Sequence, residues 1–207
     1  MPSIFSDEDK EVIRKKLIFE GTKMMTEQGI TKMNLEKLAY SAGIAKGTFY
    51  NFFRTKQHFI LAIIRDYQKQ KYDVLKKEAE QKKGTLTVYE ALHMYLKIYD
   101  PKENPMFHMR DSDLDWIASK IPPSELFDSE MDLTCCSMIL SCVKGLRKDI
   151  DYRIVSNFSR MVMFTLMQRE YVHQEVLPDN IKMIIDMLAS YITENISDTK
   201  GAPDHEI

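Results

Sequence analysis

The stretch AYSAGIAKGTFYNFFRTK, from Ala39 to Lys56, sets the strongest constraint on how this chain folds. It holds two glycines, three basic side chains and several aromatic rings. Glycine weakens helix interiors and charged groups resist burial, so neither a packed core helix nor an ordinary solvated helix accounts for the pattern. The segments on either side of this stretch are needed to explain it.

Capping signals around this stretch predict four helices. Ser6, ahead of three acidic residues, predicts the N-cap of a first helix that ends at Gly29. Asn34 predicts the cap of a short second helix, a third helix covers about residues 45–52, and Thr55 predicts the cap of a longer fourth helix. The first quarter of the chain is therefore expected to be helical throughout.

Helical patterns also dominate the rest of the chain. Thr87 and Glu90 have the spacing of a capping box, which predicts a helix to about Tyr99. No segment of alternating polarity bounded by hairpin turns is found, so the expected fold class is all-α. A further helix is expected over 135–146, where apolar residues line one face. Two long helices are expected at about 152–175 and 179–196.

The second and third helices have the dimensions of a helix-turn-helix. Gly43 lies in the tight turn between them, where glycine can adopt a positive φ without a Cβ clash. On the third helix, the recognition helix, Phe49 and Phe53 are four residues apart and are expected to face inward. The side chains expected at its N-terminal and outer sides are Lys46, Gly47, Thr48, Tyr50 and Asn51. Such a surface, with the amides of the first helical turn, favours DNA phosphate.

The charge distribution supports this interpretation. The whole chain of 207 residues has a formal net charge of −2. Residues 12–58 carry nine Lys and Arg against three Asp and Glu, a net charge of +6, which leaves −8 for the remainder. A basic head on an acidic body suggests that only the head approaches a polyanion.

The segment NLEKLAYSAGIAKGTFYNFFRTKQHFI resembles the signature of TetR-family transcriptional regulators. The resemblance covers roughly residues 10–61. Its matching positions are Ala42-Gly43-Ile44, Gly47-Thr48, Tyr50, Phe53 and Thr55-Lys56; Asn34 stands where a threonine is usual, and Phe52-Phe53 where one aromatic is common. The resemblance implies a homodimer with a divergent C-terminal domain that often binds a small effector.

Two roles are expected within the DNA-binding surface. Tyr50 and Lys56 are expected to contact phosphates and so to position the protein, whereas Lys46, Thr48 and Asn51 could reach base edges. Asn34 can act as a helix cap and as a phosphate contact. The expected DNA-binding set is Asn34, Lys46, Gly47, Thr48, Tyr50, Asn51 and Lys56, and the expected partner is a palindromic double-stranded operator.

We expect a DNA-binding domain over residues 1–58, an effector-binding and dimerisation domain over 59–197, and a disordered tail over 198–207. The N-terminus lacks the apolar segment of a signal peptide, and no run approaches the length that a bilayer requires. A cytoplasmic protein without a membrane partner is therefore expected.

The last two predicted helices are apolar around more than one face. Apolar residues at 181–192 form two adjoining stripes, and MVMFTLM at 161–167 is apolar nearly all round. A symmetric partner could cover the second face as a four-helix bundle, or both helices could be buried within a monomer. The residues expected at a dimer interface are Met163, Met167, Met183, Met187 and Tyr191.

The body offers candidates for an apolar effector pocket, although the same residues suit an ordinary core. They are Phe107, Trp116, Cys135, Met138 and Cys142. Acidic residues between 111 and 128 could favour a cationic ligand or lie in a solvated loop. The histidines and cysteines show no familiar metal spacing, and the three cysteines form no disulfide framework.

Three classes of function remain. A repressor released by a small, largely apolar effector explains the basic head, the two-sided terminal helices and the methionine-rich body. A ligand-independent DNA-binding protein explains only the first two features. An enzyme explains least, because no nucleophile-base pair, phosphate loop or metal motif is found. We therefore expect no catalytic residue, no metal and no cofactor.

Overall fold

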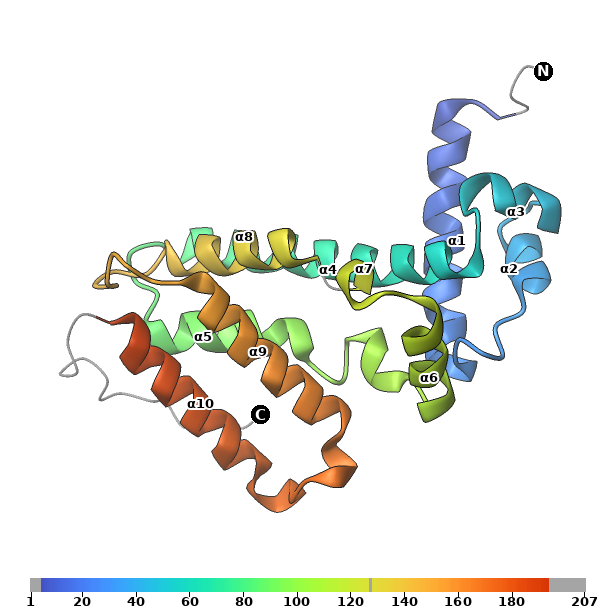
Figure 1. Cartoon of the computed structure of the whole chain (residues 1–207). Helices are drawn as coiled ribbons and strands as arrows, with labels where there is room; N and C mark the ends of the chain where they lie inside the picture. The colour runs from blue at the N-terminus through green and yellow to red at the C-terminus, as the bar shows by residue number, and fades with distance from the viewer. Residues whose placement is uncertain (1–4, 127, 194–207) are drawn as a thin grey trace. The chain divides into compact units, whose positions relative to one another are not determined.

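The computed structural model describes residues 5–126 and 128–193, and these residues are predominantly helical (Figure 1). Within those ranges there is no strand, only a single antiparallel bridge between Leu146 and Thr193. The predicted all-α class is confirmed. The predicted tail at 198–207 lies outside the described residues. The last helix, predicted to reach residue 196, ends at Ile192, because Thr193 has an extended backbone. The chain divides into two compact units.

The first unit comprises the described residues up to Lys69 together with Asn104–Asp128. The domain boundary predicted after residue 58 stays a prediction. The helices of this unit are α1 (Asp7–Gln28), α2 (Leu35–Ser41), α3 (Lys46–Phe52), the first part of α4 (Lys56–Gln81), η2 (Pro105–His108), α6 (Asp111–Lys120) and α7 (Pro123–Leu126).

The predicted helix ends in this unit are confirmed. Ser6 and Asp9 form a capping box at the start of α1, and Gly29 ends that helix with a φ of 84°. The Oγ1 of Thr55 accepts the backbone N–H of His58 at 3.2 Å, which satisfies one free donor at the start of α4.

The core of the first unit forms where α1 meets α4. A Cβ at Gly21 would clash with the side chains of Phe59 and Ile63, so only glycine allows this close approach. Leu17 and Met25, on the same helix, are fully buried. This contact fixes α1 against the first part of α4.

The second unit comprises Gln70–Glu103 and the described residues from Ser129 onward. Its elements are the rest of α4, α5 (Val88–Leu96), η1 (Lys97–Tyr99), α8 (Ser129–Leu140), α9 (Tyr152–Met167), η3 (Arg169–Tyr171), η4 (Gln174–Val176) and α10 (Leu177–Ile192). The capping box predicted at Thr87 and Glu90 is confirmed at the start of α5.

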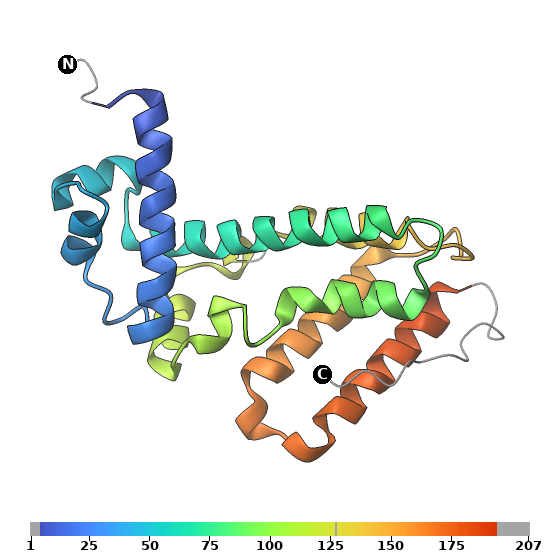
Figure 2. The same cartoon turned by 180° about the vertical axis from the view of Figure 1, so that it is seen from behind.

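Helix α5 packs against α8 and α10, and α9 packs against α8 and α10. Helices α9 and α10 run side by side in both views (Figures 1 and 2). A buried carboxylate lies inside this unit: Asp132 accepts hydrogen bonds from the hydroxyls of Tyr95 and Ser156, and the guanidinium of Arg160 lies 3.2 Å away. A buried charge is stable only with such partners, so this network favours one packing arrangement of α5, α8 and α9.

Two further predicted helix ends in the second unit are wrong. The apolar face expected as far as residue 146 ends earlier, because α8 stops at Leu140 and Gly145 turns the chain with a φ of 75°. The helix expected to reach residue 175 stops at Met167, because Gln168 leaves helical geometry and two short 3-10 turns follow.

Candidate DNA-binding surface and effector cavity

Three residues set the geometry of the helix-turn-helix. The Oδ1 of Asn34 accepts the backbone N–H groups of Glu36 at 2.9 Å and Lys37 at 3.1 Å, which caps α2 as predicted. Gly43 has a φ of 78°, and a Cβ there would meet nothing within 4 Å, so backbone conformation and not space favours glycine. Ala45 is extended and begins α3.

The inner side of α3 is clamped by aromatic rings. Phe49 and Phe53 are 0% and 3% exposed. The ring centroid of Phe59, on α4, lies 5.2 Å from that of Phe49 and 4.8 Å from that of Phe53. Aromatic pairs at such distances add to the stabilisation that burial gives. The orientation of α3 is therefore fixed by the first unit itself.

The outer side of α3 is polar. Lys46, Gly47, Tyr50 and Asn51 are exposed and Thr48 is half-buried, so the structure brings all five predicted residues of this helix onto one short element. Nothing in the chain lies within 4 Å of the Cβ that Gly47 lacks. The space beside Gly47 is open to an approaching DNA backbone.

Lys46 has a weak partner on the neighbouring helix. Its Nζ lies 3.9 Å from a carboxylate oxygen of Glu36, and both side chains are mostly exposed. Ion pairs between exposed groups contribute little to stability, because water screens them. Little free energy therefore opposes the transfer of Lys46 from Glu36 to DNA.

Lys56 has partners within the protein. Its Nζ lies 5.7 Å from the ring centroid of Trp116 and 3.5 Å from the carbonyl oxygen of Met33. Partial burial lowers the pKa of Lys56, and the nearby carboxylate of Asp113 opposes this effect. The phosphate contact predicted for Lys56 stays a prediction.

Sequence reasoning grouped Asp113 with the acidic residues of a cationic-ligand site or a solvated loop and did not predict its burial in α6. This side chain is fully buried, and its Oδ1 accepts the backbone N–H of Thr31 at 2.8 Å, while its Oδ2 accepts that of Arg110 at 3.2 Å. A Cβ at Gly29 would clash with its Oδ2. Local sequence patterns could not predict this role, because the contact with Thr31 spans 82 positions.

The predicted effector residues fall into both units. Phe107 and Trp116 belong to the first unit, whereas Cys135, Met138 and Cys142 belong to the second. Both cysteines are buried, and burial, with Asp132 nearby, raises the pKa of Cys135 to about 12. Its thiol is therefore protonated and unreactive at neutral pH. An effector role for these five residues stays a prediction.

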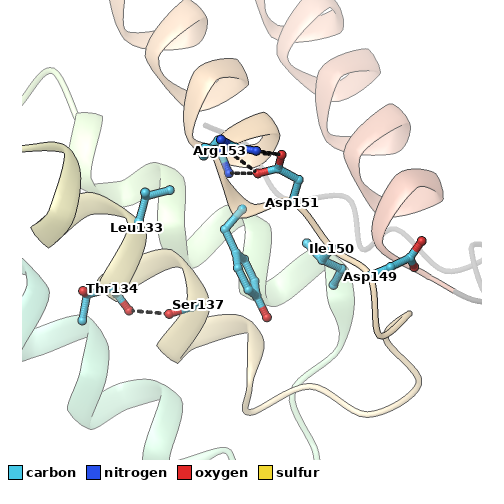
Figure 3. Close-up of a pocket in the computed structure, with 8 residues that line it drawn as sticks. Leu133, Thr134, Ser137, Asp149, Ile150, Asp151 and Arg153 are labelled. Atoms are coloured by element: carbon cyan, nitrogen blue, oxygen red, sulfur yellow. Dashed lines mark hydrogen bonds and ion pairs between the residues drawn. The ribbon is translucent and has the colours of Figure 1, made fainter.

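The second unit has a surface cavity of about 670 Å³, which sequence reasoning missed (Figure 3). Asp151 on its rim caps α9 and pairs with Arg153, and the Oγ of Ser137 donates to the carbonyl oxygen of Thr134 at 3.1 Å. The lining residues come from α8, from the connection that follows it and from the start of α9: Leu133, Thr134, Ser137, Asp149, Ile150, Asp151, Tyr152 and Arg153. Such a lining can hold an apolar body with a few polar groups.

The predicted interface residues differ in exposure. Met183 and Met187 are 67% and 46% exposed, whereas Met163 is buried at 2%. Met167 and Tyr191 are half-buried, and the hydroxyl of Tyr191 accepts the backbone N–H of Asp151 at 3.1 Å. Two further apolar side chains on α9, which sequence reasoning did not single out, are Met161 at 55% exposed and Phe164 at 50%.

The described ranges 5–126 and 128–193 contain neither a metal-binding cluster nor a membrane-spanning helix. There, no group of three His, Cys, Asp or Glu side chains is arranged to hold a metal ion. No helix in the same ranges is long and apolar enough to cross a membrane.

Comparison with known proteins gives a consistent result for the head. The profile of the family described as "Bacterial regulatory proteins, tetR family" matches residues 17–63, the region that holds the helix-turn-helix. The Transcriptional regulator AcuR of Cereibacter sphaeroides is 34% identical over 59 residues, which is 28% of this chain and 27% of that protein. The chain thus matches only about a quarter of the length of this curated relative.

Solved structures share the fold along most of the chain. A TetR-family regulator from Mesorhizobium loti has a TM-score of 0.62 at 14% identity, covering 89% of this chain and 98% of its own. The regulator FadR from Bacillus subtilis, solved with stearoyl-CoA, has a TM-score of 0.55 at 15% identity, covering 86% and 98%. The profile match thus assigns residues 17–63 to a helix-turn-helix segment of the tetR type, and the solved structures show that the chain shares the fold of TetR-family regulators.

Proposed function

We propose that this chain is a homodimeric repressor that binds a palindromic operator and is released from it by a small, largely apolar effector. The observation that carries the proposal is the two-sided build of α3. Its inner side is held by buried aromatic rings, and its outer side presents Lys46, Tyr50 and Asn51 to solvent. A rigidly held helix with exposed polar side chains is suited to the major groove.

The exposed apolar side chains of α9 and α10 support dimerisation. Met161 and Phe164 on α9, with Met183 and Met187 on α10, are all at least 46% exposed. Large apolar side chains left in water on two neighbouring helices favour association with a partner. A second copy packed on α9 and α10 would cover it, and Met163, which is buried, would support this face from beneath.

Dimerisation explains why the operator would be palindromic. Two copies related by a two-fold axis present two recognition helices to two half-sites. Their centres are expected about 34–36 Å apart along the duplex, or a multiple of that spacing. This geometry doubles the number of phosphate contacts and so the salt dependence of binding.

Selection from a random DNA library tests the DNA-binding proposal. The wild-type protein should enrich duplexes with inverted repeats, and Lys46→Ala and Thr48→Val should change which sequences are enriched. Tyr50→Ala should weaken binding to all duplexes by a similar factor, because a phosphate contact carries no sequence information. Lys76→Ala, an exposed lysine on α4 away from both proposed interfaces, is the control. Recovery of unenriched sequences by the wild-type protein would reject the proposal.

The cavity beside α8 and α9 supports the effector proposal. Leu133 and Ile150 contribute apolar side chains to its lining, and Thr134 and Ser137 contribute side chains with hydroxyl groups. An effector must bind the DNA-incompetent state more tightly, since equal affinity for both states shifts nothing. An affinity ratio of roughly 100, about 2.7 kcal/mol, is enough for a clear response.

Calorimetric titration tests this coupling. A molecule found by screening for thermal stabilisation should bind the protein roughly 100-fold more weakly when the selected duplex is present, because coupling is reciprocal. Leu133→Trp should block the cavity and abolish ligand binding while DNA binding persists. Equal ligand affinities with and without DNA would contradict release by an effector and leave DNA binding untouched.

A further inference from the structure

Helix α6 contacts Lys56, which lies just after the helix-turn-helix. This lysine is the first residue of α4 and follows α3 after a short connection, so it stands at the corner where the recognition helix turns into α4. Its ammonium lies over the ring of Trp116, within the distance at which a cation is attracted to an indole face. The same ammonium donates a hydrogen bond of 3.5 Å to the carbonyl oxygen of Met33, just before α2.

Helix α6 is itself anchored to the head. Asp113 is fully buried and accepts the backbone N–H of Thr31 at 2.8 Å, in the connection between α1 and α2. Gly29 leaves the space that this carboxylate fills. The buried anion also attracts the ammonium of Lys56. A buried carboxylate with these partners holds the first turn of α6 in one place.

We propose that Lys56 is a positioning residue: Trp116 of α6 and the backbone at Met33 hold its ammonium, which fixes the corner between α3 and α4 instead of binding a DNA phosphate. The inference rests on the proposed DNA binding. It assigns a role in DNA affinity to Trp116, a residue outside the helix-turn-helix. Two independent readouts distinguish a positioning role from a phosphate contact.

The first readout is the fluorescence of Trp116, the only tryptophan in the chain. Lys56→Met keeps most of the aliphatic stem and removes the charge, so it should change the Trp116 emission in the absence of DNA. Lys182→Met, an exposed lysine on α10, is the matched control and should leave the emission unchanged. Adding the duplex selected by the wild-type protein should also leave it unchanged, because the ammonium stays on the ring.

The second readout is the salt dependence of binding to that duplex. A lost phosphate contact lowers the slope of log affinity against log salt by about 0.9 for each copy bound, whereas a positioning residue leaves the slope unchanged. Lys56→Met and Trp116→Leu are each expected to weaken binding by roughly 3- to 30-fold without changing the slope of log affinity against log salt. The double variant should bind no more weakly than either single variant, because both remove the same contact. Trp116→Phe keeps an aromatic face and should restore most of the affinity.

The outcomes distinguish failure of the proposed DNA binding from failure of the positioning role of Lys56. A wild-type protein that selects no duplex refutes the proposed function. A wild-type protein that does select one, with a reduced slope for Lys56→Met and normal binding by Trp116→Leu, overturns the positioning role alone. If Lys56→Met does not fold, the variants Trp116→Leu and Trp116→Phe test the positioning role by themselves. If Lys56 only contacted a phosphate, Trp116→Leu would bind DNA like the wild type.

Discussion

Replacing Phe49 with alanine is expected to destabilise the first unit by roughly 3–5 kcal/mol and to abolish operator binding. Phe49 is completely buried, and its ring lies 5.6 Å from that of Phe53 and 5.2 Å from that of Phe59. The alanine leaves a cavity where three rings meet. Domains of this size are stable by only about 5–15 kcal/mol, so the head is expected to be partly unfolded.

Tyr50→Phe is the matched control for the stability measurement. It changes the next residue of α3, which is 44% exposed, and should alter stability by no more than about 0.5 kcal/mol. Urea denaturation followed by circular dichroism measures the stability difference, and gel shifts with the selected duplex measure binding. An alanine variant as stable as the wild type would show that α3 is not held by its aromatic face.

The double substitution Met183→Lys and Met187→Lys is expected to convert the proposed dimer to a monomer. Both methionines are exposed on α10, and a partner packed on this face would bury four unpaired lysine charges. Burial of unpaired charge costs several kcal/mol, so we expect the dimer dissociation constant to rise on the order of 100-fold or more. Operator affinity should fall with it, because two half-sites are no longer bound together.

Val74→Lys provides the control for that experiment. Val74 is 59% exposed on α4, within the same unit, and the same charge placed there should leave the dimer intact. Sedimentation velocity gives the oligomeric state of each variant. A wild-type protein that sediments as a folded monomer at micromolar concentration would refute the proposed interface, whatever the variants do.

The features that the sequence predicts well are those with local causes. Ser6, Asn34 and Thr55 cap their helices through contacts two or three residues away, and Gly43 turns the chain through its own φ. Phe49 faces inward from α3, and Phe53, the extended C-cap residue of that helix, packs beside it. Local spacing therefore predicted the helix-turn-helix and the polar side of its recognition helix.

The features that it missed depend on distant partners. Asp113 is buried because the backbone N–H of Thr31 donates to its carboxylate and Gly29 leaves space for it. No residue near Asp113 in the sequence indicates these contacts. Periodicity showed that α9 is apolar on several faces but could not select the inner one, since that depends on the register against α8 and α10. Met163 therefore lies inside and Met161 outside.

The insertion of Asn104–Asp128 into the first unit has a consequence for biosynthesis. The bond between Thr31 and Asp113 spans 82 positions, so α1–α3 emerge from the ribosome long before α6 can cover them. Closing so long a loop costs conformational entropy, which the early helices cannot recover alone. The nascent head is thus expected to stay incomplete until translation passes Asp128, and a chain stalled before that point should be exposed to proteases and chaperones.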